Sequence, residues 1–270
     1  PCAGTKLGCD MTLWNFKGKS YTVGRQYPPE RLKADKENAT LNIKDEYKME
    51  NKPGKGHHVL FSADKDGKFL LDLNFESAEG GKTLGNGVWT VGSAKMGQYI
   101  HIPYGRVSGK IAYNEDTLTV KGYGYMDKVW QTVQATDMAV RSINFSTNTR
   151  SPRFAGRISL TGDGDYLGYA IYNGPEGSKV VTPKAIKDDG SAYTGKNFPK
   201  GDLSFEWQDE TPTLQFGASK TFQKASILDK IDGWFAKKAF KLSAGEVFFY
   251  RGRSDGSHGK KIDWCVTGAK

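Results

Sequence analysis

The sequence contains no apolar run long enough to cross a membrane as a helix. Hydrophobic residues make up 37 % of its 270 residues, and the mean hydropathy is −0.60. A membrane-spanning helix needs roughly 20 consecutive, mainly apolar residues. A transmembrane helix is therefore excluded. The length instead suits two domains of ordinary size, roughly 100–150 residues each, with a sizeable core.

Cysteine is scarce, with Cys2, Cys9 and Cys265 as the three examples. There is no C-x-x-C pair, so neither a zinc site nor a redox site is expected, and we predict no metal. Cys265 alternates with apolar residues in "KIDWCVTG", which places it on the polar face of a strand. A disulfide from Cys265 to Cys9 or to Cys2 would join the two ends of the chain. Three free thiols are the alternative.

The common catalytic signatures are also missing. The sequence has no G-x-S-x-G, no H-E-x-x-H, no phosphate-binding loop and no G-x-G-x-x-G that opens a helix. These motifs mark serine hydrolases, zinc proteases, nucleotide-hydrolysing enzymes and dinucleotide-binding enzymes. None of these classes is indicated, and we expect no cofactor.

Positive charge is in excess, but it is not concentrated. The net charge is +9 and the isoelectric point about 9.2. The lysines are interleaved with acidic residues, as in "KADKEN" and "IKDEYKMEN". A nucleic-acid interface needs clustered basic residues within a known module. We therefore interpret the charge as a lysine-rich soluble surface and reject nucleic acid as a partner.

Two features indicate a secretory route. The sequence begins at Pro1 without a signal-peptide core, as a mature or trimmed chain would. It also carries two glycosylation sequons, which begin at Asn38 and Asn144. We expect a secretory or extracellular glycoprotein, with a cytoplasmic location as the alternative.

Short alternating strands are abundant. The chain has 33 glycines and 12 % aromatic residues, and in "KFLLDLNFES" Phe69, Leu71 and Leu73 alternate with polar residues. Similar runs recur about every 10 residues, which is typical of antiparallel barrels or sandwiches. The charged residues 28–56 are predicted to form a long surface loop.

One segment has helical spacing. Apolar residues recur every three or four positions in "ASILDKIDGWFAKKAFKL", so we predict a helix near residues 226–241, weakened at Gly233. Packing against a sheet or inside a barrel is the preferred interpretation. A basic amphipathic helix on a membrane surface is the alternative.

The strand "LTVKGYGYMDKVWQTV", residues 118–133, has two unlike faces. Tyr123, Tyr125 and Asp127 share one face, while Gly122 and Gly124 lie on the other. The glycines leave room for a bulky group, either a ligand or a neighbouring tryptophan. The tyrosines offer flat surfaces with hydroxyl tips. The strand suits a pocket wall or a domain seam, and a purely structural corner is the alternative.

Residues 58 to 133 resemble a known family. The runs "FLLDLNFES", "GGKTLGNG", "YIHIPYGRVSGKI" and "LTVKGYGYMDKVWQ" follow the order seen in lipocalin-like two-domain proteins. This family includes hydroxyneurosporene synthase, AttH proteins and fungal Diels–Alderases and hetero-Diels–Alderases. Its hallmark is G-x-G-Y-x-D-H-x-W after a P-x-x-x-x-x-G strand. The matching residues are Pro103, Gly109, Gly122, Gly124, Tyr125, Asp127 and Trp130.

The resemblance implies an all-β fold class, with two lipocalin-like antiparallel β-barrel or sandwich domains and one short helix. The expected domains are residues 1–135 and 136–270. Lys128 replaces the family's histidine, which argues against hydratase chemistry because histidine is the natural proton shuttle near neutral pH.

The implied activity is a cofactor-independent pericyclase of natural-product biosynthesis. It would catalyse a [4+2] cycloaddition, Diels–Alder or hetero-Diels–Alder, on a hydrophobic polyene or quinone methide in an aromatic pocket between the domains. Orientation in such a cavity can supply up to about 7–11 kcal/mol, and hydrogen-bond donors can polarise a carbonyl. The alternatives are a non-catalytic lipophile-binding protein, or a hydratase or dehydratase with Asp127 as acid or base and Lys128 as helper.

The candidate site residues follow from the strand faces and the resemblance. We predict Tyr125, Asp127 and Lys128 to be catalytic. The predicted substrate-binding residues are Trp14, Tyr104, Arg106, Tyr123, Trp130, Arg141, Tyr169, Tyr172, Trp207 and Tyr250.

Overall fold

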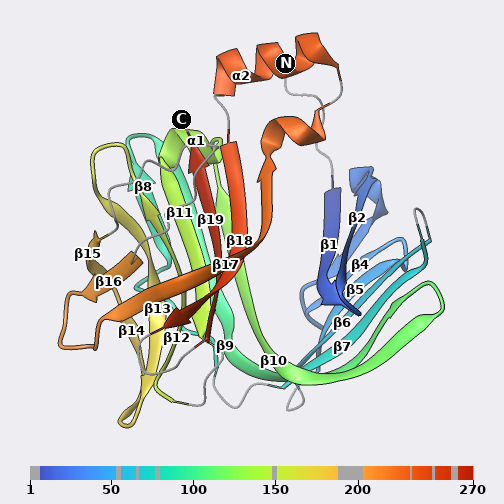
Figure 1. Ribbon diagram of the computed structural model, residues 1–270, viewed down its shortest axis with the longest axis horizontal. Coiled ribbons are helices and arrows are strands. Elements are labelled where there is room, and N and C mark those ends of the chain that lie inside the picture. Colours follow the sequence, from blue (N-terminus) through green and yellow to red (C-terminus); the bar gives the residue numbers. More distant parts are fainter. Residues whose placement is uncertain are drawn as a thin grey trace. The chain divides into compact units, whose positions relative to one another are not determined.

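The structure is a computed structural model, and it is predominantly β, which confirms the predicted all-β class (Figure 1). The residues it describes are 7–52, 56–64, 67–76, 80–147, 151–187, 203–231, 233–244, 247–256 and 261–269. All structural statements concern this part of the chain.

The chain divides into two compact units. The first unit comprises residues 1–79 and 104–124, and the second comprises residues 80–103 and 125–270. The division is not the predicted single boundary at residue 135. The reason is that β9 (Ala94–Tyr113) and β10 (Asp116–Gln131) are long strands, and each contributes residues to both units.

The first unit is built from antiparallel strands. β1 pairs with β2 as a hairpin, β3 to β7 pair in chain order, and β7 pairs with residues 106–113 of β9. The bounds are β1 (Leu7–Phe16), β2 (Lys19–Tyr27), β3 (Leu32–Asp35), β4 (Thr40–Ile43), β5 (Tyr47–Lys52), β6 (Gly56–Ala63) and β7 (Phe69–Glu76), with a 3-10 turn, η1 (Pro29–Arg31), before β3.

The charged residues 28–56 are therefore largely strands rather than the predicted surface loop (Figure 1). β3, with the sequence "LKAD", is exposed at every position and forms the edge of its sheet. Lysines on an exposed edge strand discourage pairing with other chains. The polar composition of β3 is therefore explained by its position at the edge of the sheet, and it did not indicate a loop.

Alternation along β1 builds the core of the first unit. Cys9, Met11 and Leu13 are buried, and they pack in one cluster with Phe61 and Phe69. Cys9 is a free thiol, so the predicted disulfide from Cys9 to Cys265 is absent. Its place on the apolar face explains this, and burial, followed by the charge of Asp10, raises its pKa. Cys2 and the side chain of Cys265 lie outside the described part.

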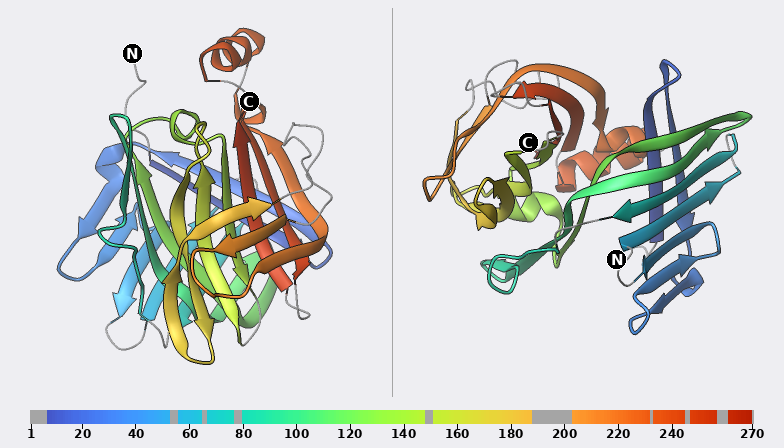
Figure 2. Two further views of the ribbon diagram at one scale, coloured as in Figure 1. Left: turned by 90° about the vertical axis from the view of Figure 1, so that its left-hand side faces the viewer. Right: turned by 90° about the horizontal axis from the view of Figure 1, so that it is seen from below.

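The second unit contains a nine-stranded antiparallel sheet that curls round on itself (Figure 2). Its order is β14-β13-β12-β11-β19-β18-β17-β16-β15. The bounds are β11 (Arg141–Thr147), β12 (Arg153–Leu160), β13 (Tyr166–Gly174), β14 (Gly177–Val181), β15 (Pro183–Lys187), β16 (Leu203–Trp207), β17 (Leu214–Ser226), β18 (Val247–Gly256) and β19 (Lys261–Ala269).

Both faces of this sheet are covered. Ile143, Phe145 and Ile158 lie in a large aromatic cluster on one face. Tyr169 and Ile171 of β13 lie on the other face, in a separate cluster with Ile100 of β9. Alternation along each strand produces this two-sided burial. The described residues that cover the second face come from β8 (Val88–Val91), β9, β10 and the short helix α1 (Ala135–Met138).

The helix predicted for residues 226–241 begins later. β17 continues to Ser226, a 3-10 turn, η2 (Ile227–Lys230), follows, and the helix α2 spans Trp234–Ala244. Ser226 and Asp229 form a capping box that favours the early turn. Gly233 has a φ of 85°, a left-handed backbone conformation that separates the turn η2 from the helix α2.

The two glycines of β10 have different surroundings. A Cβ on Gly124 would lie 2.5 Å from Cε1 of Phe75 and 2.7 Å from Cγ2 of Val107. A Cβ on Gly122 would meet nothing within 4 Å. The bulky neighbour at Gly124 is therefore Phe75, a half-buried residue of β7.

We expect Gly124→Ala to destabilise the protein by about 1–3 kcal/mol, because the added methyl group overpacks the contact with Phe75. Gly122→Ala is the matched control. It should be neutral or stabilising by about 0.4–1 kcal/mol, since alanine restricts only the unfolded chain. Urea denaturation of both variants measures the difference. If Gly124→Ala and Gly122→Ala had equal free energies of unfolding, the contact between position 124 and Phe75 would not be what requires glycine there.

Candidate functional site

One face of β10 carries the candidate site. Tyr125 and Asp127 are half-buried on this face, and Val129 and Gln131 continue it along the strand. Lys128 and Trp130 alternate with them and are exposed. Trp130 contributes to the other side of the strand, where its indole occupies the space left by Gly97.

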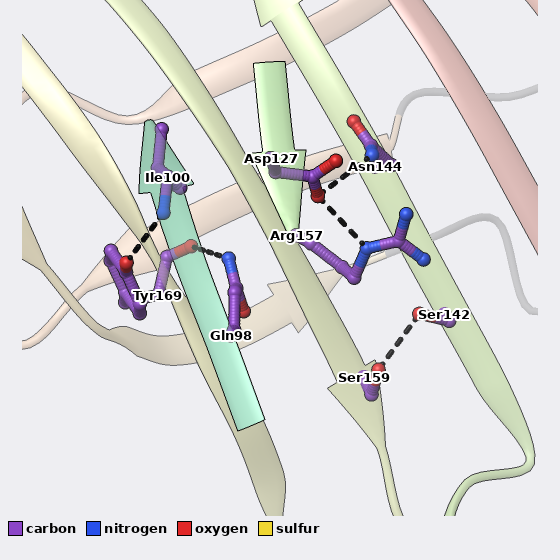
Figure 3. Close-up of polar contacts among 8 residues, drawn as sticks. All are labelled: Gln98, Ile100, Asp127, Ser142, Asn144, Arg157, Ser159 and Tyr169. Atoms are coloured by element: carbon purple, nitrogen blue, oxygen red, sulfur yellow. Dashed lines mark hydrogen bonds and ion pairs between the residues drawn. The ribbon is translucent and has the colours of Figure 1, made fainter. Parts of the chain in front are cut away.

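The Asp127 carboxylate is held by two side chains of neighbouring strands. Its Oδ2 accepts a hydrogen bond from Nε of Arg157 and another from Nδ2 of Asn144, each 3.4 Å long (Figure 3). The side chains of Asp127 and Arg157 are 16 % and 28 % exposed. Partial burial strengthens such charge-assisted contacts relative to the surface.

Strand register brings these groups together. In the β11–β12 pair Asn144 lies opposite Arg157, and Ser142 lies opposite Ser159. The Oγ atoms of the two serines are 2.7 Å apart (Figure 3). Because side chains two residues apart share a face, the two pairs form one polar stripe. The intervening Ile143 and Ile158 point into the core on the opposite face.

A pocket of about 210 Å³ adjoins this stripe. Its walls combine apolar groups from several elements with the polar groups of β11 and β12. The lining residues are Met96, Val129, Gln131, Thr136, Met138, Ala139, Ser142, Arg157, Ser159 and Phe249. The pocket lies wholly within the second unit.

Among the residues that the structure describes, Arg157 is the only charged one in the pocket wall. Its Nε binds Asp127, and within the described part of the chain its two terminal nitrogens have no hydrogen bond or ion pair. These nitrogens point away from Asp127 (Figure 3). They are rigid, permanently charged donors suited to an oxygen acceptor on a ligand.

Tyr125 is electrostatically coupled to Asp127. Burial raises the pKa of Tyr125 well above its usual value, the Asp127 carboxylate raises it further, and Arg157 opposes the shift. The Tyr125 hydroxyl is buried and makes no hydrogen bond of ordinary length to the described residues. It is therefore a neutral phenol beside the carboxylate.

Tyr169 fastens β9 to the sheet. Its hydroxyl donates to the carbonyl of Lys82 at 2.5 Å and accepts from the backbone N–H of Ile100 at 3.1 Å. The Gln98 amide donates to the Tyr169 carbonyl at 3.3 Å (Figure 3). Tyr169 is fully buried, so its part is structural in this arrangement.

Four predicted residues belong to the first unit. Tyr104 and Tyr123 stack with ring centroids 4.6 Å apart. Trp14 is half-buried on β1. Arg106 is exposed, with its Nε 3.8 Å from Oε2 of Glu76. None of these residues lines the pocket of the second unit.

Three predicted residues of the second unit lie in its aromatic core. Tyr172, Trp207 and Tyr250 are buried together, and the Trp207 indole donates to the carbonyl of Pro212 at 3.2 Å. Arg141 borders a small cavity of about 30 Å³ near Tyr166. None of the predicted residues lines the 210 Å³ pocket. Asp127 is connected to its wall by the hydrogen bond from Arg157, and Tyr125 interacts electrostatically with Asp127.

Sequence reasoning missed Arg157, Ser142 and Ser159. The available signal was the strand "RFAGRISL", in which Arg153, Arg157 and Ser159 share one face. Asn144, predicted to carry a glycan, is part-buried within β11 and donates to Asp127, and its glycosylation remains a prediction. Asn38 is exposed beside Asp35, and its glycosylation remains a prediction.

Within the described ranges, no group of three or more His, Cys, Asp or Glu side chains is arranged to hold a metal ion. The polar groups that the structure does provide are Arg157, Ser142 and Ser159 in the pocket wall, Asp127 bound to Arg157, and the phenol of Tyr125 next to Asp127. This set can donate hydrogen bonds and exchange protons.

No protein-family model and no curated protein sequence matches this chain. Solved structures share its fold, and two of them are informative. A candidate AttH protein from Nitrosomonas europaea has a TM-score of 0.63 at 14 % identity, covering 97 % of this chain and 81 % of that one. Kievitone hydratase from Nectria haematococca has a TM-score of 0.52 at 11 % identity, covering 93 % and 76 %. The chain has the lipocalin-like two-domain β fold. The predicted resemblance is confirmed for the fold, and at these identities the likeness concerns the fold alone.

We expect Tyr125 to remain a neutral phenol at pH 10, where an ordinary tyrosine is half ionised. The contribution of Tyr125 to stability is constant below pH 10 and falls as the pH rises further, because the unfolded chain then releases this proton more readily. Ultraviolet titration of the wild type against Tyr125→Phe measures this. A phenolate signal at pH 10 that is missing from the variant would contradict the burial argument.

Proposed function

We propose that the chain is an enzyme that adds water to, or removes water from, a small lipophilic substrate bound in the second-unit pocket. The observation that carries the proposal is the Arg157 side chain. Its Nε donates to Asp127, its side chain lines the pocket, and its terminal nitrogens point away from Asp127 (Figure 3). Such a fixed donor fits a substrate carbonyl oxygen.

Arg157 would polarise that carbonyl. Fixed donors in a partly buried site stabilise charge that develops on an oxygen, because they need little reorganisation during the reaction. Ser142 and Ser159 add hydroxyl groups on the same wall. A carbon–carbon double bond conjugated to the carbonyl would become electrophilic at its far carbon.

Asp127 and water would complete the reaction. The oxygen of water forms a bond to the far carbon of the double bond, and a water proton passes to the Asp127 carboxylate. The protonated Asp127 then gives this proton to the near carbon of the resulting enolate, which restores the carboxylate and completes the addition of one water. Loss of water follows the same steps in reverse. Tyr125, kept neutral by its surroundings, would donate a hydrogen bond next to Asp127.

Pocket size and fold similarity support this assignment. The volume of about 210 Å³ is below the usual ~300–1,000 Å³ of pockets for drug-sized ligands. It suits a small molecule, or one ring of a larger substrate, better than an entire polyene. Kievitone hydratase, whose name states a hydration, has the same fold.

The second candidate is the [4+2] cycloaddition. It is favoured by the apolar part of the wall, formed by Met96, Val129, Met138 and Phe249, next to the Arg157 donors. A cycloaddition needs orientation and carbonyl polarisation, but no proton acceptor. In this reaction Asp127 would only position Arg157.

Incubation in oxygen-18-labelled water separates the candidates. The probes are kievitone and a panel of small lipophilic enones and β-hydroxy ketones, with mass spectrometry as the readout. Hydration adds one labelled water, whereas cycloaddition rearranges a diene–dienophile probe without a change of mass. If the probes bind but are not converted, the protein is a non-catalytic lipophile-binding protein, and both catalytic proposals are overturned.

We expect Asp127→Asn to lower kcat by about 10²–10⁴-fold with little change in KM, because it removes the proton acceptor. Arg157→Met should lower kcat by about 10²–10³-fold and raise KM, because it removes the donors that hold the oxygen. Steady-state kinetics on the hydrated probe measure both. Lys121→Met, an exposed change on the same strand, is the control for the loss of one charged group.

A purely structural ion pair would behave differently. Asp127→Asn would then reduce the free energy of unfolding and leave kcat intact in the folded fraction. Urea denaturation of each variant, with the Asp127→Asn and Arg157→Met double variant, separates this outcome from loss of chemistry.

A further inference from the structure

The helix α2 exposes large apolar side chains to an unusual degree. Trp234, Phe235 and Leu242 are 65 %, 81 % and 80 % exposed. The other exposed large hydrophobic residues of the described chain lie between 36 % and 48 %. Three such residues on an 11-residue helix form a concentrated apolar surface.

Helical geometry gives this surface a direction. Lys237 and Phe240 are half-buried and mark the less exposed side of α2. At 100° per residue, Phe235 and Leu242 fall on nearly the same bearing, on the opposite side. The most exposed apolar residues therefore point outward.

The charge of α2 has one sign. Its sequence, "WFAKKAFKLSA", contains Lys237, Lys238 and Lys241 and no acidic residue. The ammonium group of Lys238 lies 5.1 Å from the centre of the Trp234 ring. Lys238 and Trp234 thus flank the outward apolar side with a cation and an amphipathic ring.

We propose that α2 docks on the surface of an anionic lipid bilayer. Phe235 and Leu242 enter the boundary between headgroups and acyl chains, Trp234 lies at headgroup level, and the exposed Lys238 and Lys241 contact lipid phosphates. Charge complementarity selects this occupant, because two copies of α2 packed face to face would bring lysines together without an acidic partner. No helix of the described chain is long and apolar enough to span a bilayer, so α2 lies on the surface.

The binding is reversible and depends on charge. Each lysine near an anionic surface strengthens binding about fivefold, and the few inserted side chains add a modest apolar contribution. Affinity is therefore much lower for neutral vesicles and falls as salt screens the lysines. This inference is independent of the proposed reaction.

Vesicle flotation with the full chain tests the proposal. The probes are vesicles of phosphatidylcholine alone and of phosphatidylcholine with about one third phosphatidylserine, each at low salt and at about 0.5 M salt. The variants are Phe235→Gln with Leu242→Gln, and Lys238→Gln with Lys241→Gln. Lys33→Gln with Lys36→Gln removes the same charge from an exposed part of the first unit and is the matched control.

The expected result is flotation with anionic vesicles at low salt, at least a tenfold loss of affinity in both α2 variants, and no more than a small loss in the control. An equal loss of affinity in the control variant would show that binding depends on the net charge of the protein and not on α2, and would overturn the proposal. Equal binding to neutral vesicles or no flotation would also overturn it. So would concentration-dependent dimerisation abolished by the apolar variant, because a second copy would then occupy the face.

Discussion

The register between β11 and β12 is the constraint on which the site depends. It sets Asn144 opposite Arg157 and Ser142 opposite Ser159. A slip of one residue would turn these groups into the aromatic core and bring Ile143 and neighbouring apolar residues out of it. Apolar packing on one face of the sheet therefore fixes the polar stripe on the other.

The second face of this sheet can form a pocket because β8, β9, β10 and α1 cover it. Tyr169 bonds to the backbone at Lys82 and Ile100, and this fastens the start of β9 to β13. Asp127 of β10 in turn binds Arg157 of β12. These contacts join segments distant in sequence within one unit, and they place the pocket outside the aromatic core of the sheet.

Alternation in the sequence predicted local structure well and long-range placement poorly. It gave the all-β class, the two faces of β10 and the pairing of Tyr125 with Asp127 on one face. The same rule cannot say which face of a two-sided sheet forms a pocket. Tyr172, Trp207 and Tyr250 therefore appeared as site residues although they fill the core. Arg157 escaped prediction because its role arises from partners on other strands.

A crystal structure with a brominated aryl ketone bound tests the central claim most directly, that Arg157 presents free donors to the pocket. Anomalous scattering locates the bromine without ambiguity. The account predicts one ring in the second-unit pocket, with the ketone oxygen about 3 Å from a terminal nitrogen of Arg157 while Nε still binds Asp127. A ligand bound elsewhere, or an Arg157 whose terminal nitrogens turn to Asp127 instead, would contradict it.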